Sequence, residues 1–232
     1  MTLEGKLVAV TGGFGQLGTA VVRAALDAGA QVAALDRARP PADTTTLGGA
    51  LALGELDLAE SDAAVRALDQ VATRFGGLDA LVNVAGTFRW EALEQGSLDT
   101  WDLLYRVNLR SAVSVSRAAL PHLTKRGGGR IVNIGAGAAA VKAGAGMGAY
   151  TASKAGVHKL TESLAEELKD RGITVNAVLP SIIDTPVNRA DMPKADFSRW
   201  VSPGAIADVI VFLLSDRARA VTGALIPVSG RV

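Results

Sequence analysis

The chain has 232 residues, a formal net charge of +1 and no cysteine. A chain of this length buries about 70% of its unfolded surface and needs no disulfide or metal to stabilise its fold. The lack of cysteine excludes disulfides and thiolate metal sites. With two histidines and basic residues spread along its length, the sequence predicts no metal site, no nucleic-acid partner and no membrane-binding patch.

The N-terminal residues MTLEGKLVAV lack the basic segment and apolar core that mark a secretory signal. The longest apolar run near the other end covers residues 209–214 and is far too short to span a bilayer. We therefore expect a cytoplasmic protein.

Short apolar runs alternate with stretches of helical periodicity. The expected strands cover residues 7–10, 31–35, 52–56, 80–84, 130–134, 174–179 and 224–228. The expected helices cover residues 16–28, 61–75, 102–125, 149–171 and 203–215. Gly29 and Gly172 follow two of these helices, as C-terminal caps do. Near-continuous apolar strands alternating with helices predict one α/β domain over residues 1–232, with about seven parallel strands and helices on both faces.

Two irregular segments interrupt this alternation. Residues 37–49 form a loop by composition, and residues 180–200 are long for a connection between a strand and a helix. Long loops that follow a strand commonly bind ligands.

The sequence VAVTGGFGQLGTA places Gly13, Gly15 and Gly18 in G-x-G-x-x-G spacing, after a strand and at the start of a helix. Small residues in this position let the backbone approach a pyrophosphate, and the helix N-terminus offers N–H donors. The pattern predicts a dinucleotide site.

Asp36 ends the next strand, where a carboxylate hydrogen-bonds the ribose hydroxyls of a dinucleotide and repels a 2′-phosphate. This favours NAD(H). Arg37 and Arg39 follow at once, and either could hold a 2′-phosphate, so NADP(H) stays open as the alternative.

Tyr150 and Lys154 are four residues apart on an expected helix and therefore share one face. A lysine ammonium beside a phenol favours the phenolate, so we expect the pKa of Tyr150 to be lowered. The pair predicts proton transfer to a substrate as hydride arrives.

With these motifs, the chain resembles the short-chain dehydrogenase/reductase family over nearly its whole length. The matching motifs are residues 11–18, Asp57, NVAG at residues 83–86, Asn108 in VNLRS, Tyr150-x-x-x-Lys154, and NAVLP before Thr185. The resemblance implies a Rossmann-type doubly wound sheet and NAD(P)-dependent hydride transfer on a small molecule. Two positions depart from the main branch of the family, which has glycine where Gln16 and Ser181 stand.

The resemblance also implies residue roles. Asn108 would hold a water in a proton relay, Lys154 would bind the nicotinamide ribose, and Thr185 would approach the nicotinamide amide or the phosphates. Asn83 could instead cap a strand end, and Asn108 could bridge helix backbone. The implied cofactor-binding residues are Gly12, Gly13, Phe14, Gly15, Gln16, Leu17, Gly18, Asp36, Arg37, Asp57, Leu58, Asn83, Ala85, Gly86, Tyr150, Lys154, Pro180, Ile183 and Thr185.

One hydroxyl is missing from the family pattern. Most members carry a serine about thirteen residues before the tyrosine, where this chain has Ala136 or Gly137. Losing such a preorganised donor costs on the order of 10²–10³ in rate, unless the substrate does not need it.

From Ile134 onward the chain also resembles dihydropteridine reductase, a divergent branch with alanine at that position. The similar stretches are GAGAAA, GMGAYTASKAGVHKL, VLPSIIDTPVNRADMPKADFSRW and TGALIPV. A quinonoid dihydropterin spreads charge over ring nitrogens, so one oxyanion donor matters less. The candidate substrate contacts are Phe88, Ala136, Met147, Asn188 and Met192. Trp90, Phe197 and Trp200 could add a flat wall or could be ordinary core residues.

The leading hypothesis is thus a reductase of a conjugated ring. One alternative is a keto-acyl or alcohol dehydrogenase in which another donor replaces the serine, although Lys142 and Ser153 do not stand at the matching position. A second alternative is a cofactor-binding regulator with little catalysis. The resemblance implies a homodimer or homotetramer through the helices after the fourth and fifth strands. The small residues Ala112, Ala118, Ala155 and Gly156 there are compatible with such a contact and equally with packing on the sheet.

Overall fold

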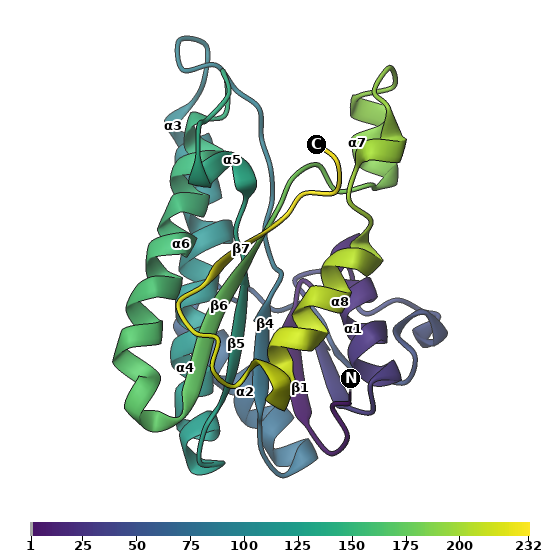
Figure 1. The fold of residues 1–232 in the computed structure, drawn as a ribbon, viewed down its shortest axis with the longest axis vertical. Helices are drawn as coiled ribbons and strands as arrows, with labels where there is room; N and C mark the ends of the chain where they lie inside the picture. Colours follow the sequence, from purple (N-terminus) through teal and green to yellow (C-terminus); the bar gives the residue numbers. More distant parts are fainter. Residues whose placement is uncertain (1) are drawn as a thin grey trace.

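The computed structural model describes residues 2–232, which form one parallel sheet flanked by helices (Figure 1). The strand order is β3-β2-β1-β4-β5-β6-β7, and each neighbouring pair is parallel. The strands are β1 (Leu7–Thr11), β2 (Gln31–Leu35), β3 (Leu51–Leu53), β4 (Ala80–Asn83), β5 (Gly129–Ile134), β6 (Ile173–Pro180) and β7 (Leu225–Val228). The order reverses between β1 and β4, and in such sheets the crevice beside that point receives the ligand.

Helices cover both faces of the sheet because successive strand residues point to opposite sides. Val8 and Val10 pack in the core with α1 and α8, whereas Ala9 packs in the core with α2, α4 and α6. The helices are α1 (Gln16–Asp27), α2 (Ser61–Phe75), α3 (Leu98–Leu104), α4 (Ser111–Lys125), α5 (Gly137–Ala140), α6 (Gly148–Leu168), α7 (Pro186–Asp191) and α8 (Pro203–Leu214). The predicted fold class, a doubly wound sheet of seven parallel strands, is confirmed.

The predicted helix over residues 102–125 differs most from the structure. Helix α3 begins earlier, at Leu98, where the Ser97 side chain accepts a hydrogen bond from the Asp99 N–H. A π-helical turn (Tyr105–Arg110) then joins α3 to α4. An extra residue in the turn shifts the helical phase, so a pattern with a period of 3.6 residues does not reveal it.

The third strand is shorter than the predicted residues 52–56. It ends at Leu53, since Glu55 has a φ of +60° and leaves the extended conformation. Gly54 lies so close to Pro40 that a side chain there would collide with it. The predicted glycine caps are confirmed, with φ values of +94° at Gly29 and +66° at Gly172.

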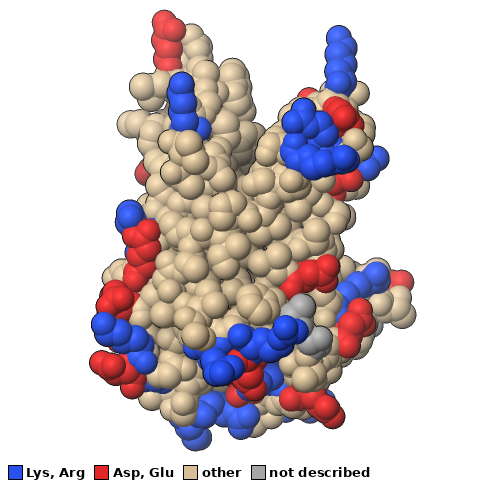
Figure 2. Space-filling view, viewed as in Figure 1, with Lys and Arg blue, Asp and Glu red and all other residues tan. Residues whose placement is uncertain are grey.

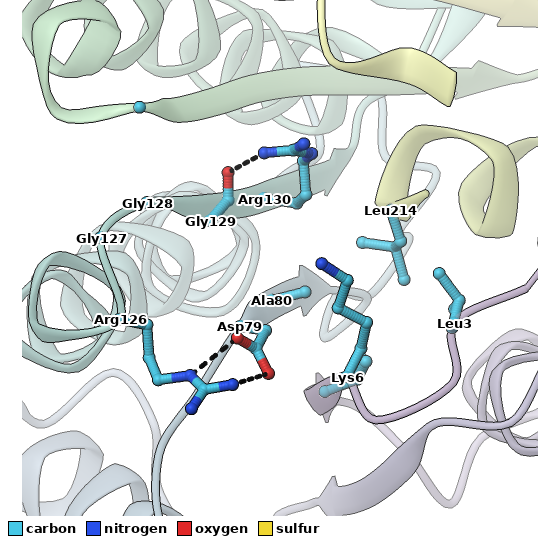
Figure 3. Close-up of a pocket in the computed structure, with 12 residues that line it drawn as sticks. Leu3, Lys6, Asp79, Ala80, Arg126, Gly127, Gly128, Gly129, Arg130 and Leu214 are labelled. Atoms are coloured by element: carbon cyan, nitrogen blue, oxygen red, sulfur yellow. Dashed lines mark hydrogen bonds and ion pairs between the residues drawn. The ribbon is translucent and has the colours of Figure 1, made fainter. Parts of the chain in front are cut away.

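A cavity of about 310 Å³ lies at the amino ends of the strands (Figure 3). Asp79 accepts hydrogen bonds there from the Leu7 N–H and from Arg126 Nε, each at 2.9 Å. The pairing raises the pKa of Arg126 and joins the start of β1 to the end of α4. Lys6 is likewise paired, with Asp216 at 3.3 Å. This cavity lies at the opposite edge of the sheet from the glycine loop, and we assign it a structural role.

Candidate active site

The glycine loop turns tightly between β1 and α1. Gly12 has a φ of +63°, and a Cβ at Gly18 would collide with the Gly12 carbonyl oxygen, so neither position accepts a side chain without a shift. Gly15 is the N-cap of α1, and a Cβ there would meet only the Gly12 oxygen, at 3.4 Å. The first turn of α1 therefore faces open space, as pyrophosphate binding requires.

A cavity of about 760 Å³ opens beside this loop, between the carboxyl ends of β2 to β4 and the π-helical turn. Most of the predicted cofactor-binding residues line it, namely Gly12, Phe14, Gly15, Gln16, Leu17, Gly18, Asp36, Arg37, Asp57, Leu58, Ala85 and Gly86. Its size and lining fit the adenosine and pyrophosphate portions of a dinucleotide. The remaining predicted residues lie outside this lining.

Gly13 is one of these exceptions. A Cβ at Gly13 would lie 2.7 Å from the Ala34 Cβ, so this glycine permits the loop to pack on β2 rather than facing the cavity. Pro180 ends β6, Ile183 pairs with Val201, and Thr185 caps α7. Ile183 and Thr185 lie beyond the end of β6, and none of the three residues lines the cavity.

The Asp36 carboxylate joins β2 to the glycine loop. Its Oδ2 accepts from the Phe14 N–H at 3.0 Å and its Oδ1 accepts from the Ala38 N–H at 2.9 Å. Arg37 also lines the cavity. Arg39, the other candidate for a 2′-phosphate, instead pairs with Glu55 at 3.3 Å and lies outside the lining.

Asn83 does not line the cavity, contrary to the prediction. Its Nδ2 donates to Ser116 Oγ at 3.0 Å and to Asn133 Oδ1 at 2.8 Å. Asn133 in turn donates to Thr161 Oγ1 at 2.9 Å. These buried hydrogen bonds join the ends of β4 and β5 to α4 and α6. Asn83 therefore fixes the end of β4, and the chain that follows it carries Ala85 into the cavity lining.

Arg106 is a cavity residue that the sequence analysis missed. Its Nη2 lies 2.8 Å from Asp57 Oδ2 and 2.7 Å from Glu60 Oε1. The hydrogen bond from Arg106 lowers the pKa of Asp57 and keeps this carboxylate charged at the cavity wall. Arg106 belongs to the π-helical turn, two residues before Asn108, and its orientation follows from that turn, which a regular helical pattern does not signal.

The predicted catalytic residues Asn108 and Lys154 come together around Gly86. A Cβ at Gly86 would lie 3.2 Å from Asn108 Oδ1 and 3.3 Å from Lys154 Nζ. Asn108 Oδ1 accepts from the Thr87 N–H at 2.7 Å, and its Nδ2 donates to Ser153 Oγ at 2.9 Å. The Asn108 side chain thus ties the π-helical turn to α6 and to the loop after β4.

Tyr150 and Lys154 lie on α6, and burial shifts both pKa values. It raises the pKa of Tyr150 to about 12 and lowers the pKa of Lys154 to about 8. The prediction that Lys154 lowers the pKa of Tyr150 is therefore wrong, because desolvation of the phenolate dominates. Lys154 Nζ donates to the Ile134 carbonyl oxygen at 2.7 Å, which places its charge at the end of β5.

Phe88 stands beside Tyr150. The two rings form an edge-to-face pair with centroids 4.9 Å apart, and Phe88 remains 47% exposed. Trp90 Nε1 donates to the Ala145 carbonyl oxygen at 2.8 Å, so the loop after β4 is tied to the loop that precedes α6. An aromatic wall thus stands next to the phenol.

The space-filling view shows an uncharged hollow between two lobes at the carboxyl edge of the sheet (Figure 2). One lobe carries α3 and α5, and the other carries α7 (Figure 1). Met192 ends α7 and is exposed, and Met147 caps α6. Asn188, another predicted substrate contact, instead donates from Nδ2 to the Ile183 carbonyl oxygen at 2.7 Å, which stabilises its own loop.

Two further predicted contacts are buried. Ala136 is only 4% exposed, so its methyl group offers almost no surface to a substrate. Its N–H donates to His158 Nε2 at 3.2 Å. Trp200 is also buried and packs against Phe197, which assigns it to the core rather than to a substrate wall.

No helix among residues 2–232 is long and apolar enough to cross a membrane. Nor does any cluster of three or more histidine, aspartate or glutamate side chains in this range have the arrangement of a metal site.

Comparisons with known proteins agree with this geometry. A sequence profile described as short chain dehydrogenase matches residues 6–196. A 3-oxoacyl-acyl-carrier-protein reductase of Thermotoga maritima is 32% identical, covering 99% of this chain and 98% of that protein. A D-threitol dehydrogenase of Mycolicibacterium smegmatis is 34% identical, covering 98% of this chain and 93% of that protein.

A solved structure, of a short-chain type dehydrogenase/reductase from Mycobacterium ulcerans, superposes with a TM-score of 0.89 at 27% identity. The alignment covers 99% of this chain and 90% of that one. The two enzymes above differ in their named substrates yet are almost equally identical to this chain. Overall similarity therefore does not select a substrate.

Proposed function

The chain belongs to the short-chain dehydrogenase family of oxidoreductases, and from this premise we propose that it is an NAD(P)H-dependent reductase of a flat, conjugated small molecule such as a quinonoid dihydropterin. Residues 1–232 act in this proposal as one NAD(P)-binding domain. The family implies a nicotinamide dinucleotide, which when bound supplies the hydride.

The proposed binding roles follow the cavity lining. The first turn of α1 and the loop glycines bind the pyrophosphate, and Asp36 accepts from the adenosine ribose hydroxyls. Asp57 and Leu58 flank the adenine. Because a carboxylate at the position of Asp36 repels a 2′-phosphate, the proposal favours NAD(H) over NADP(H).

Tyr150 is the proposed proton donor. With its pKa raised to about 12, the phenol keeps its proton at neutral pH and can transfer it as the substrate accepts hydride. Lys154 places an ammonium at the end of β5, where it stabilises the phenolate that remains and binds the nicotinamide ribose. Asn108 is proposed to position a water that returns a proton to Lys154.

The substrate class rests on one observation, the lack of a second donor beside Tyr150. Residues 135–140 carry only glycine and alanine, so they offer no hydroxyl. The Ala136 N–H is already used by His158. A simple ketone needs preorganised donors for its developing oxyanion, whereas a conjugated ring spreads that charge. The exposed Phe88 ring beside Tyr150 also favours a flat acceptor.

A β-keto thioester is the second candidate substrate. The reductase of Thermotoga maritima acts by its name on 3-oxoacyl groups and aligns with almost the whole chain. At 32% identity the substrate named for that relative does not carry over to this chain, and the absent hydroxyl near Ala136 supports the ring as the first candidate.

A steady-state assay of NADH and NADPH oxidation tests this proposal. We expect kcat/KM for quinonoid dihydropterin to exceed that for an acetoacetyl ester by roughly tenfold or more, since a missing donor costs ketones most. Ala136→Ser adds a hydroxyl that extends beyond the buried methyl group, so it should raise activity on the ester more than on the ring. Ala140→Ser, at an exposed position of α5, is the matched control. A higher kcat/KM for the ester would contradict the ring assignment.

A further inference from the structure

His158 is a buried titratable residue to which the proposed mechanism gives no part. It lies on α6, four residues after Lys154 and eight after Tyr150, so the three side chains follow one face of the helix. Its side chain is 3% exposed and lies against the end of β5.

The contact between His158 and β5 has a defined chemistry. The Ala136 N–H donates to Nε2 at 3.2 Å, which requires a lone pair on Nε2 and places the ring proton on Nδ1. A charged imidazolium could not accept this bond. Burial and the neighbouring Lys154 charge lower the pKa of His158, which favours the neutral ring; Lys159 acts in the same direction and Glu162 opposes it.

Lys154 and His158, one helical turn apart on α6, thus bind two backbone groups at the end of β5. Lys154 Nζ donates to the Ile134 carbonyl oxygen, and His158 Nε2 accepts from the Ala136 N–H. Gly135 lies between these groups, and a Cβ on it would be 2.5 Å from His158 Nε2. The close approach of α6 to β5 therefore depends on the glycine and the histidine together.

We propose that His158 is a positioning residue, which holds residues 135 and 136 against α6 so that the loop after β5 keeps its position relative to Tyr150. The inference rests on the proposed role of Tyr150 as proton donor. The histidine acts through its acceptor nitrogen on the Ala136 N–H, in the stretch where the family resemblance places a serine.

The test compares two substitutions of His158. Glutamine can present an acceptor oxygen near the position of Nε2, whereas methionine fills similar space with no comparable acceptor. We expect His158→Met to lower kcat by roughly 10- to 100-fold, because a displacement near 1 Å is costly for catalysis. Dissociation of NADH, measured by its fluorescence, should stay unchanged, and His158→Gln should recover most of the turnover.

A purely structural role gives the opposite ranking. If His158 only fills the core, methionine is tolerated and glutamine, with an unpaired amide, is the more harmful change. That ranking, or equal kcat values for both variants, would overturn the inference. Turnover is measured with NADH on quinonoid dihydropterin and on an acetoacetyl ester, with thermal unfolding recorded for each variant.

Gly135→Ala provides a second test of the role of His158 if His158→Met does not fold. It retains the histidine but displaces its ring, and we expect it to lower kcat in the same way; Gly204→Ala on α8, whose Cβ would come no closer than 4.0 Å to Ser202 Oγ, is the matched control. Equal turnover in the two glycine variants would contradict the inference. Tyr150→Phe, measured in parallel, separates the proposed function from the proposed role of His158. If Tyr150→Phe stays active, the proposed function fails. If Tyr150→Phe is inactive but Gly135→Ala is fully active, only the role of His158 fails.

Discussion

Tyr150 and Lys154 respond to the same burial with pKa shifts of opposite sign. A phenol is neutral when protonated, so burial raises its pKa, to about 12. An ammonium is charged when protonated, so burial lowers its pKa, to about 8. Near neutral pH both groups therefore hold their protons, a state suited to reduction.

The pH dependence of reduction follows from these two values. We expect kcat/KM, which reports the free enzyme, to be constant from about pH 6.5 to 7.5 and to fall above about pH 8 as Lys154 loses its proton. Tyr150, with its pKa at about 12, stays protonated across this range. Initial rates of NADH oxidation in buffers of constant ionic strength provide the measurement. A profile that is flat to pH 9.5 would show that the charge of Lys154 is not required.

At the scale of elements, the carboxyl end of β2 is where the proposed function places the choice between NAD(H) and NADP(H). Asp36 binds the N–H of Phe14 in the glycine loop, and it also faces the site of the adenosine ribose. One carboxylate therefore stabilises the loop and, in the proposed function, also repels a 2′-phosphate. Arg37, next in the chain, is the group that could accept that phosphate.

Asp36→Asn separates these two effects because asparagine keeps the shape and one acceptor oxygen but removes the charge. We expect the ratio of kcat/KM for NADPH to that for NADH to rise roughly tenfold or more, since a neighbouring unit charge is worth at least about 1.4 kcal/mol. Adding Arg37→Gln should reverse the gain. An unchanged ratio in Asp36→Asn would show that cofactor choice is made elsewhere in the cavity.

The π-helical turn is the element that completes the site. It brings Arg106 to Asp57 at the adenine end of the cavity and Asn108 to Thr87 and Ser153 at the catalytic end. A regular helix over residues 102–125 would not place both side chains in this way, because each added residue rotates the following side chains by about 100°.

At the scale of the whole molecule, an apolar strip remains exposed along α3, the π-helical turn and α4. It includes Leu98, Trp101, Tyr105 and Val113. The predicted small-residue face is different: Ala112 and Ala118 are buried, and a Cβ at Gly156 would lie 2.5 Å from Leu109, so these residues pack within the subunit. We propose that the exposed strip, rather than the small residues, forms the contact between subunits of a homodimer or homotetramer.

Val113→Arg tests this proposal. A charge in the strip should shift the mass measured by light scattering after gel filtration towards that of a single chain, because an unpaired charge at an interface is costly. Val65→Arg is the matched control, since Val65 on α2 has a similar exposed fraction of 43%, against 41% for Val113. Equal masses for both variants would place the contact on another face.

The sequence by itself determined the features that depend on neighbours along the chain. Apolar runs predicted six of the seven strands to within one or two residues at each end, and the glycine spacing predicted the turn into α1. Residue chemistry also indicated Asp36, Tyr150 and Lys154 as candidate site residues, and the family resemblance indicated the missing hydroxyl near Ala136. These properties follow from local backbone sterics and side-chain periodicity, which are encoded in short segments.

The tertiary structure alone decided which groups meet across the fold and how deeply they are buried. Asn83 turned from the cavity to Ser116, Arg106 reached Asp57, and the Ala136 N–H met His158. The direction of the Tyr150 pKa shift also depended on burial, which opposed the effect expected from Lys154. Hydrogen-bond partners and desolvation arise between segments far apart in sequence, so no local pattern contains them.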